Sequence, residues 1–171
     1  MFDTVRAWSA AVGRVAIGCV LCLLAVRPAA GDANALVRAL IKPDLATLSP
    51  DAVTKRFAKL VPLERAHPMP NMLLLAGGDM QQRLELRYEA NDGGKQRFAH
   101  AMLRFLATDP EADHRALQQA LRKKLGEPRY ERRDDGPLPT VGWRLGRLEV
   151  ALSHTEIRGK PWMEVSVQNP R

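Results

Sequence analysis

Charged and apolar residues alternate along several segments of the chain. The clearest is 83–90, RLELRYEA, and the segments 147–154 and 162–168 follow the same period of two residues. This period predicts strands that have one buried face and one face toward water. The apolar positions of the three segments are Leu84, Leu86, Tyr88, Leu148, Val150, Leu152, Met163, Val165 and Val167.

A hairpin turn is predicted at residues 91–94, NDGG, because Asn, Asp and Gly tolerate positive φ angles. The segment after this turn, 95–107, fits two patterns. The helical set is Phe98, Ala101, Met102 and Phe105, and the strand set is Ala99, Ala101, Leu103 and Phe105. We predict a strand, since the segment 83–90 needs a partner across the turn.

The segment 109–125 carries the signals that begin and end a helix. Asp109 and Pro110 suit the first positions, and Gly126 suits the position after the last turn. One apolar stripe is formed by Leu117, Leu121 and Leu125, with His114 extending it. Nearer the N-terminus, Ser49 and Pro50 predict another helix start within a helical segment, 31–61.

Grouped strands joined by tight turns predict the α+β class, with an antiparallel sheet and one to three helices packed on one face. We expect a single domain over residues 31–171. Its parts are a helical N-terminal segment (31–61), hairpin strands (72–107), a helix (109–125) and C-terminal strands (128–168).

The first thirty residues have the features of a cleavable signal peptide. Arg6 and Arg14 precede an uncharged run, residues 15–26, and small residues follow it. A run of this length is shorter than the ~20 residues that cross a bilayer. We expect cleavage between Ala30 and Ala35 and a periplasmic or secreted protein. The alternatives are an uncleaved membrane anchor and a lipoprotein signal at Cys19.

Export changes how the composition is interpreted. Both cysteines, Cys19 and Cys22, lie in the leader, so the mature chain has no thiol. Three of the 26 basic and one of the 19 acidic residues also lie there, which leaves 23 against 18, a net charge of +5. We expect another envelope or secreted protein as the partner, or alternatively an anionic polymer or lipid surface, and no nucleic acid.

The stretch AHPMPNM, residues 66–72, raises the question of a soft-metal site. His67, Met69 and Met72 are ligand types that Cu(I) prefers. In one extended chain, however, His67 and Met69 share a face and Met72 points to the other. We therefore favour a proline-stiffened connector in which Met72 begins a buried strand, and keep a periplasmic Cu(I) carrier as an alternative.

Catalytic motifs are missing from the sequence. The mature chain has no cysteine nucleophile and no G-x-S-x-G or phosphate-loop frame. Ser153 and His154 are neighbours in a predicted strand, so their side chains point to opposite faces and cannot form a catalytic pair. The sequence predicts no enzyme and no cofactor.

The remaining candidates suggest binding. Trp143 and Trp162 are either core residues or interface anchors, since tryptophan is enriched at binding hot spots. Arginines on or beside the polar faces of the strands could receive a partner by charge complementarity or strand addition. These are Arg83, Arg87, Arg144 and Arg147. We therefore expect a non-catalytic binding protein of inhibitor or immunity type, or an assembly accessory. The competing interpretation is an ordinary solvated face.

Overall fold

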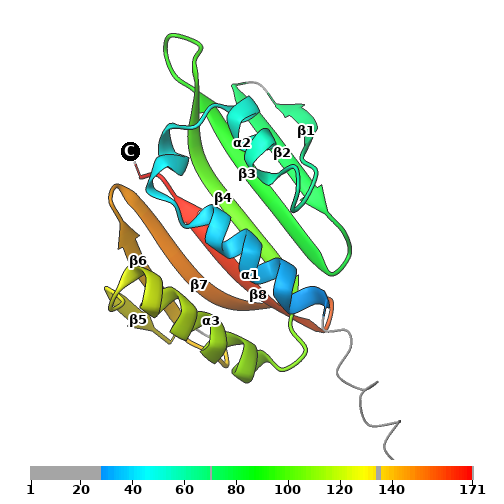
Figure 1. Ribbon diagram of the computed structural model, residues 1–171, viewed down its shortest axis with the longest axis vertical. Helices are drawn as coiled ribbons and strands as arrows, with labels where there is room; N and C mark the ends of the chain where they lie inside the picture. The colour runs from blue at the N-terminus through cyan, green and yellow to red at the C-terminus, as the bar shows by residue number, and fades with distance from the viewer. Residues whose placement is uncertain (1–27, 70, 134–135, 171) are drawn as a thin grey trace, which may run out of the picture.

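A computed structural model describes residues 28–69, 71–133 and 136–170, without the side chains of residues 28–32 and 67–69. Its strands form one antiparallel sheet of eight, in the order β1-β2-β3-β4-β8-β7-β6-β5 (Figure 1). The strands are β1 (Glu64–Met69), β2 (Met72–Gly78), β3 (Gln82–Ala90), β4 (Gln96–Leu106), β5 (Tyr130–Arg132), β6 (Thr140–Leu145), β7 (Leu148–Ile157) and β8 (Lys160–Gln168).

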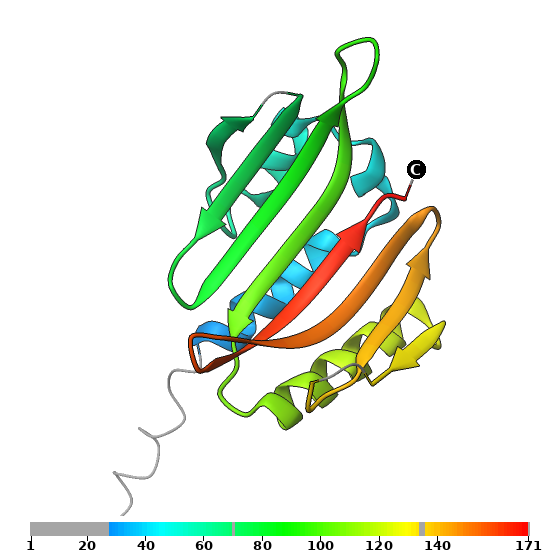
Figure 2. The same ribbon diagram turned by 180° about the vertical axis from the view of Figure 1, so that it is seen from behind.

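The helices cover one face of this sheet. They are α1 (Pro28–Leu40), the 3-10 helix η1 (Pro43–Thr47), α2 (Pro50–Phe57) and α3 (Pro110–Leu125). Helices α1 and η1 contact β4, and α3 packs on β6, β7 and β8. Figures 1 and 2 show that all helices of the described ranges lie on one side of the sheet. The predicted α+β class, with helices on one face of an antiparallel sheet, is confirmed.

The helix signals in the sequence act as expected. The Ser49 hydroxyl accepts a hydrogen bond from the Ala52 amide at 3.3 Å, and the Asp109 carboxylate accepts one from the Ala112 amide at 3.1 Å. Each satisfies one of the free amides of a first helical turn. Gly126 ends α3 with a φ of 85°, which glycine adopts without strain. Helix α1 begins at Pro28, earlier than the expected helix start.

Strand β4 contains a β-bulge that explains its ambiguous sequence. Arg87 pairs with His100 and the next residue, Tyr88, pairs with Phe98, so Ala99 has no partner across the pair. The extra residue shifts the phase of β4, and both Phe98 and Ala101 are buried although they lie three apart. The helix-like spacing in this segment thus arises from an interrupted strand.

The core lies between the sheet and the helices. Buried side chains from successive strands line up across the sheet, as in the row Leu86, Ala101, Val167, Val150 and Trp143. The apolar positions predicted from alternation in β3, β7 and β8 are all buried. The chain therefore uses every second residue of these strands to hold the helices.

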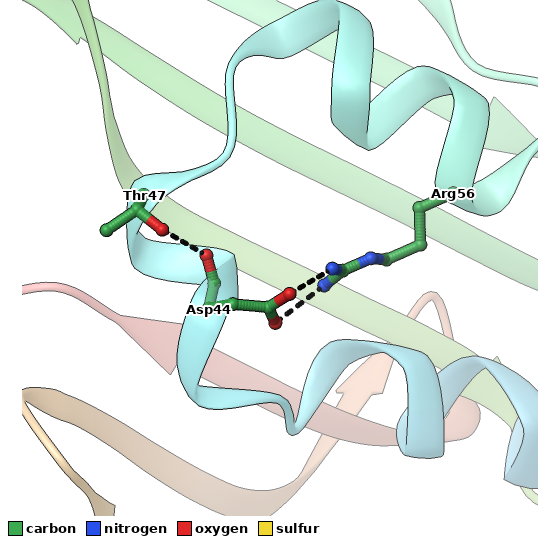
Figure 3. A network of polar contacts seen from close by, with 3 residues as sticks. All are labelled: Asp44, Thr47 and Arg56. Carbon is green, nitrogen blue, oxygen red and sulfur yellow. Dashed lines mark hydrogen bonds and ion pairs between the residues drawn. The ribbon is translucent and has the colours of Figure 1, made fainter.

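A polar contact joins η1 to α2 above the core. The Arg56 guanidinium donates two hydrogen bonds to the Asp44 carboxylate, one of them at 3.1 Å, and the Thr47 hydroxyl donates to the Asp44 carbonyl at 2.8 Å (Figure 3). The bond from Arg56 holds the pKa of Asp44 below its usual value. This contact fixes two short helices that have few residues of their own to pack.

The segment 66–72 differs from the expected connector. Residues 64–69 form β1, which turns back at once, and Met69 pairs with Met72 across the hairpin. Of the expected buried run after Met72, only Leu75 is fully buried; Leu73 on the same face is partly buried, and Leu74 lies on the face without helices. The prediction that Met72 begins a strand is confirmed, since β2 starts there, but residues 66–69 belong to strand β1 and not to a connector.

The signal peptide and its cleavage region were both expected near the N-terminus, where the described residues begin. The signal peptide falls largely on residues 1–27, which lie outside the described residues. The expected cleavage region, 30–35, lies within α1. No helix within the described ranges combines the length and apolar character that a membrane crossing requires.

Candidate functional site

The face of the sheet without helices, here called the open face, has a row of small and medium side chains across its middle. Met102 of β4, Ser166 of β8, Ala151 of β7 and Gly142 of β6 are consecutive partners in this row. The first three are partly buried by their neighbours, and Gly142 is fully buried. We call this row the low strip, because Ser166, Ala151 and Gly142 have shorter side chains than the arginines and glutamates of the same face.

Ion pairs border this strip. Arg104 of β4 contacts Glu164 of β8 at 2.9 Å, across the strands. On β3, Arg83 contacts Glu85 at 2.6 Å and Arg87 contacts Glu89 at 3.3 Å. The pairs distribute both signs of charge over the surface, so the open face is polar without being strongly cationic.

A hollow of about 610 Å³ lies at one corner of the open face, where β8 ends beside the bulge of β4. Arg87, Arg97, His100 and Gln168 are among its lining side chains. Because Asn169 donates from its backbone amide to the Ala99 carbonyl at 2.9 Å and from its side chain to the Phe98 carbonyl at 3.0 Å, the bulge is closed. The fixed bulge determines how His100 is presented to the hollow.

The surroundings of His100 favour its neutral form. Burial lowers its pKa below the ordinary value of 6.5, and the positive charge of Arg87 acts in the same direction. A neutral imidazole can donate one hydrogen bond and accept another. The corner of the open face thus offers donors and acceptors of several kinds.

The far end of the strip is closed by an aromatic side chain. Tyr130 of the edge strand β5 pairs with Gly142, and its ring lies where a side chain on Gly142 would otherwise be. The guanidinium of Arg132 lies 4.9 Å from the centre of this ring. Covering a strand glycine in this way compensates for its missing side chain and shapes the end of the strip.

Three of the four predicted arginines lie on the open face. Arg83 and Arg87 project from β3, and Arg144 projects from β6, where its Nε donates to the Gly146 carbonyl at 3.0 Å. Trp162 also lies on this face, since it alternates with the buried residues of β8 and pairs with Leu106. Its indole nitrogen has no hydrogen-bond partner among the described residues.

The other two predicted binding residues lie elsewhere. Trp143 is 2% exposed and its indole donates to the Gly126 carbonyl at 3.1 Å, so it belongs to the core beneath α3. Arg147 is in the turn between β6 and β7 and donates to the Ala46 carbonyl of η1 at 3.2 Å. Trp143 is thus a core residue, one of the two alternatives left open by the sequence, whereas Arg147 stays exposed and also contacts η1.

The three residues considered for copper fall partly outside the description. The side chains of His67 and Met69 are not described, and Met72 is partly buried. The hairpin invalidates the argument that separated these residues, because that argument assumed one extended chain. Among the described residues, no three His, Cys, Asp or Glu side chains gather as a metal site would require. The Cu(I) carrier stays an untested alternative.

Sequence reasoning missed the residues that shape the open face. Small residues such as Ser166, Ala151 and Gly142 carry no signal by themselves. The strand alternation placed them on the polar face, however, so a correct register would have aligned them.

Comparisons with protein-family models, with curated proteins and with solved structures found no match to this chain.

Proposed function

We propose that this protein is an exported, non-catalytic binding protein of the bacterial envelope, and that its open face binds another protein. The observation that carries the proposal is the low strip through Met102, Ser166 and Ala151, bordered by ion pairs on the side of the sheet opposite the helices. A surface of mixed charge around a less polar centre resembles the anatomy of protein interfaces.

The ion pairs favour a protein over an anionic polymer or lipid. A polyanion is attracted by cations that are free to exchange their counterions. On the open face Arg83, Arg87 and Arg104 are already paired with glutamates. A partner with both signs of charge can satisfy such a surface, and charges arranged in this way give specificity more than raw affinity.

Export is the second part of the proposal, and it is supported by the leader-like pattern of residues 1–30 and by the cysteine-free remainder. The partner is then another envelope or secreted protein. This would suit an inhibitor or immunity-type protein, or an accessory of envelope assembly. Recovery of the intact chain, with Met1 retained, from the cytosol of its native host would contradict this part.

The test uses two matched substitutions. Ala151→Arg raises a long side chain from the middle of the strip, whereas Ala116→Arg makes the same change on the exposed side of α3. A partner captured from the host envelope by cross-linking would be purified, and its affinity for each variant measured at low salt and at about 0.5 M salt, where the Debye length falls to roughly 4 Å.

We expect Ala151→Arg to weaken binding at least about tenfold, since it obstructs the centre of the interface, and Ala116→Arg to change it little. Binding that persists at high salt supports a protein interface. Equal effects of the two substitutions would refute the open face as the site. Binding to anionic vesicles that disappears at high salt would favour the polymer or lipid alternative instead.

A further inference from the structure

A groove runs between helix α2 and the edge strand β1, on the helix side of the sheet and therefore away from the open face. It has a volume of about 370 Å³. Its apolar residues include Leu63, which is 8% exposed, and Leu75, which is 3% exposed. Thr54 and Lys55 of α2 form one wall, and Arg65 of β1 lies opposite.

Strand β1 ends the sheet, so one edge of its backbone faces no other strand among the described residues. Its other edge pairs with β2 over Glu64, Arg65 and Ala66. A free edge of this kind carries unpaired amide and carbonyl groups, which can hydrogen-bond to an added strand. The groove lies beside that edge, where the added strand's side chains would need space.

The charges that line the groove favour a ligand with an acidic side chain. Among the described residues neither Lys55 nor Arg65 forms an ion pair, whereas three arginines of the open face are paired with glutamates. The one acid at the groove is Asp51, in the first turn of α2. Two unpaired cations beside an apolar floor favour a carboxylate that follows an apolar side chain.

We propose that an extended acidic segment of a partner protein binds here by adding a strand to β1. Alternate side chains of the added strand point toward α2, so residues two apart enter the groove together. An apolar side chain contacts Leu63 and Leu75, and an Asp or Glu two positions away lies between Lys55 and Arg65. This second site is distinct from the open face, although the same partner could use both.

The experiment titrates the ¹⁵N-labelled protein with the acetylated and amidated peptide Val-Thr-Val-Thr-Asp-Thr and follows the backbone amides by NMR. We expect shifts concentrated on β1 and on the first turns of α2. A peptide with Lys in place of Asp should bind more weakly, because it brings a third cation to the groove. A peptide N-methylated at alternate amides should not bind, because it cannot complete the strand pairing.

The double substitution Lys55→Glu and Arg65→Glu reverses the charge of the groove. We expect it to weaken binding of the Asp peptide about tenfold or more and to strengthen binding of the Lys peptide. Lys59→Glu is the matched control, since Lys59 is exposed near the end of α2 and does not line the groove. Dispersed amide spectra would show that each variant is folded.

Three results would overturn the inference: no shifts at millimolar Asp peptide, equal binding of the N-methylated peptide, or equal affinity in the charge-reversed variant. Ala151→Arg separates this inference from the proposed function, because it alters the open face alone. If Ala151→Arg abolishes binding of the peptide, the groove is not the site. If the peptide binds normally while Ala151→Arg leaves the protein partner's affinity unchanged, the proposed open-face function fails and the groove stands.

Discussion

The two faces of the sheet are built from the same strands but are used in different ways. On the helix side, leucines, valines and aromatic rings fill the space under α1, η1, α2 and α3. On the open face, small residues alternate with paired charges. Because strand residues alternate between faces, one residue of sequence separates a position that determines folding from one that is available to a partner.

The two faces require different types of residue. The helix side must exclude water, so its residues are large, apolar and closely packed. The open face must stay in water and still avoid unwanted association. Arg83–Glu85 and Arg104–Glu164 place charge on a surface that would otherwise be an exposed apolar sheet.

Neighbouring residues of β4 give the largest expected contrast. Leu103 is fully buried on the helix side, and Met102 is partly buried on the open face. We expect Leu103→Ala to lower the free energy of unfolding by about 2–5 kcal/mol, since it leaves a cavity. Met102→Ala should cost less than about 1 kcal/mol. Urea unfolding of both variants measures the difference, and similar losses would mean that the open face is also a packed core.

Much of this contrast could be predicted from the sequence. Uninterrupted alternation in 83–90 identified β3 and both of its faces, and the buried positions of β7 and β8 followed from the same period. The signals at Ser49 and Asp109 placed two helix starts. These features are local, and local preferences agree with the final fold here.

The parts that were missed depend on contacts between distant residues. Strand β1, ERAHPM, has no alternation and contains a proline, so only its pairing with β2 makes it a strand. The bulge at Ala99 depends on the register between β3 and β4. At the candidate site, Arg83 and Arg87 were placed correctly by alternation. The sequence left Trp143 open between core and interface, because its burial depends on pairing with Val150.

The two tryptophans test the same contrast with one residue type. Trp143 donates a hydrogen bond to Gly126 from inside the core, whereas the indole nitrogen of Trp162 on the open face has no partner among the described residues. We expect Trp143→Phe to cost about 1–3 kcal/mol, through lost packing and an unpaired carbonyl. Trp162→Phe should cost less than about 1 kcal/mol. Thermal unfolding measures both losses. A larger loss for Trp162→Phe than for Trp143→Phe would contradict the assignment of Trp143 to the core.

A smaller effect concerns pH. Burial lowers the pKa of His114 on α3 below 6.5, although the hydrogen bond from its Nε2 to the Pro139 carbonyl at 2.9 Å opposes this. Below about pH 6.5 the unfolded chain therefore binds protons that the folded chain does not, so stability falls as the pH is lowered. The decrease stops once the pH is below the pKa of the folded state.

Urea unfolding at pH 7.5 and 5.5 measures this decrease. His114→Gln should make it smaller, because the titrating group is removed. His100→Gln on the open face should act in the same direction, since burial lowers the pKa of His100 too. The faces differ in accessibility: a bound partner should change the NMR titration of His100 and leave that of His114 unchanged. If stability rises on acidification, the lowered pKa values of His114 and His100 do not control it.

The smallest expected effects come from one ion pair on each side. Asp44–Arg56 joins η1 to α2 on the helix side, and Arg104–Glu164 joins β4 to β8 on the open face. Pairs exposed to this extent contribute at most about 1 kcal/mol in double-mutant cycles. We expect Asp44–Arg56 to have the larger coupling energy, since it links two short helices that share little else, whereas β4 and β8 are already joined by their backbones. The contribution of Asp44 should disappear in acid as the pH falls through its lowered pKa.

If instead the coupling energy of Arg104–Glu164 is larger than that of Asp44–Arg56, the open face contributes to the stability of the fold. Its paired charges would then be structural, and the case for their role in recognition would weaken accordingly.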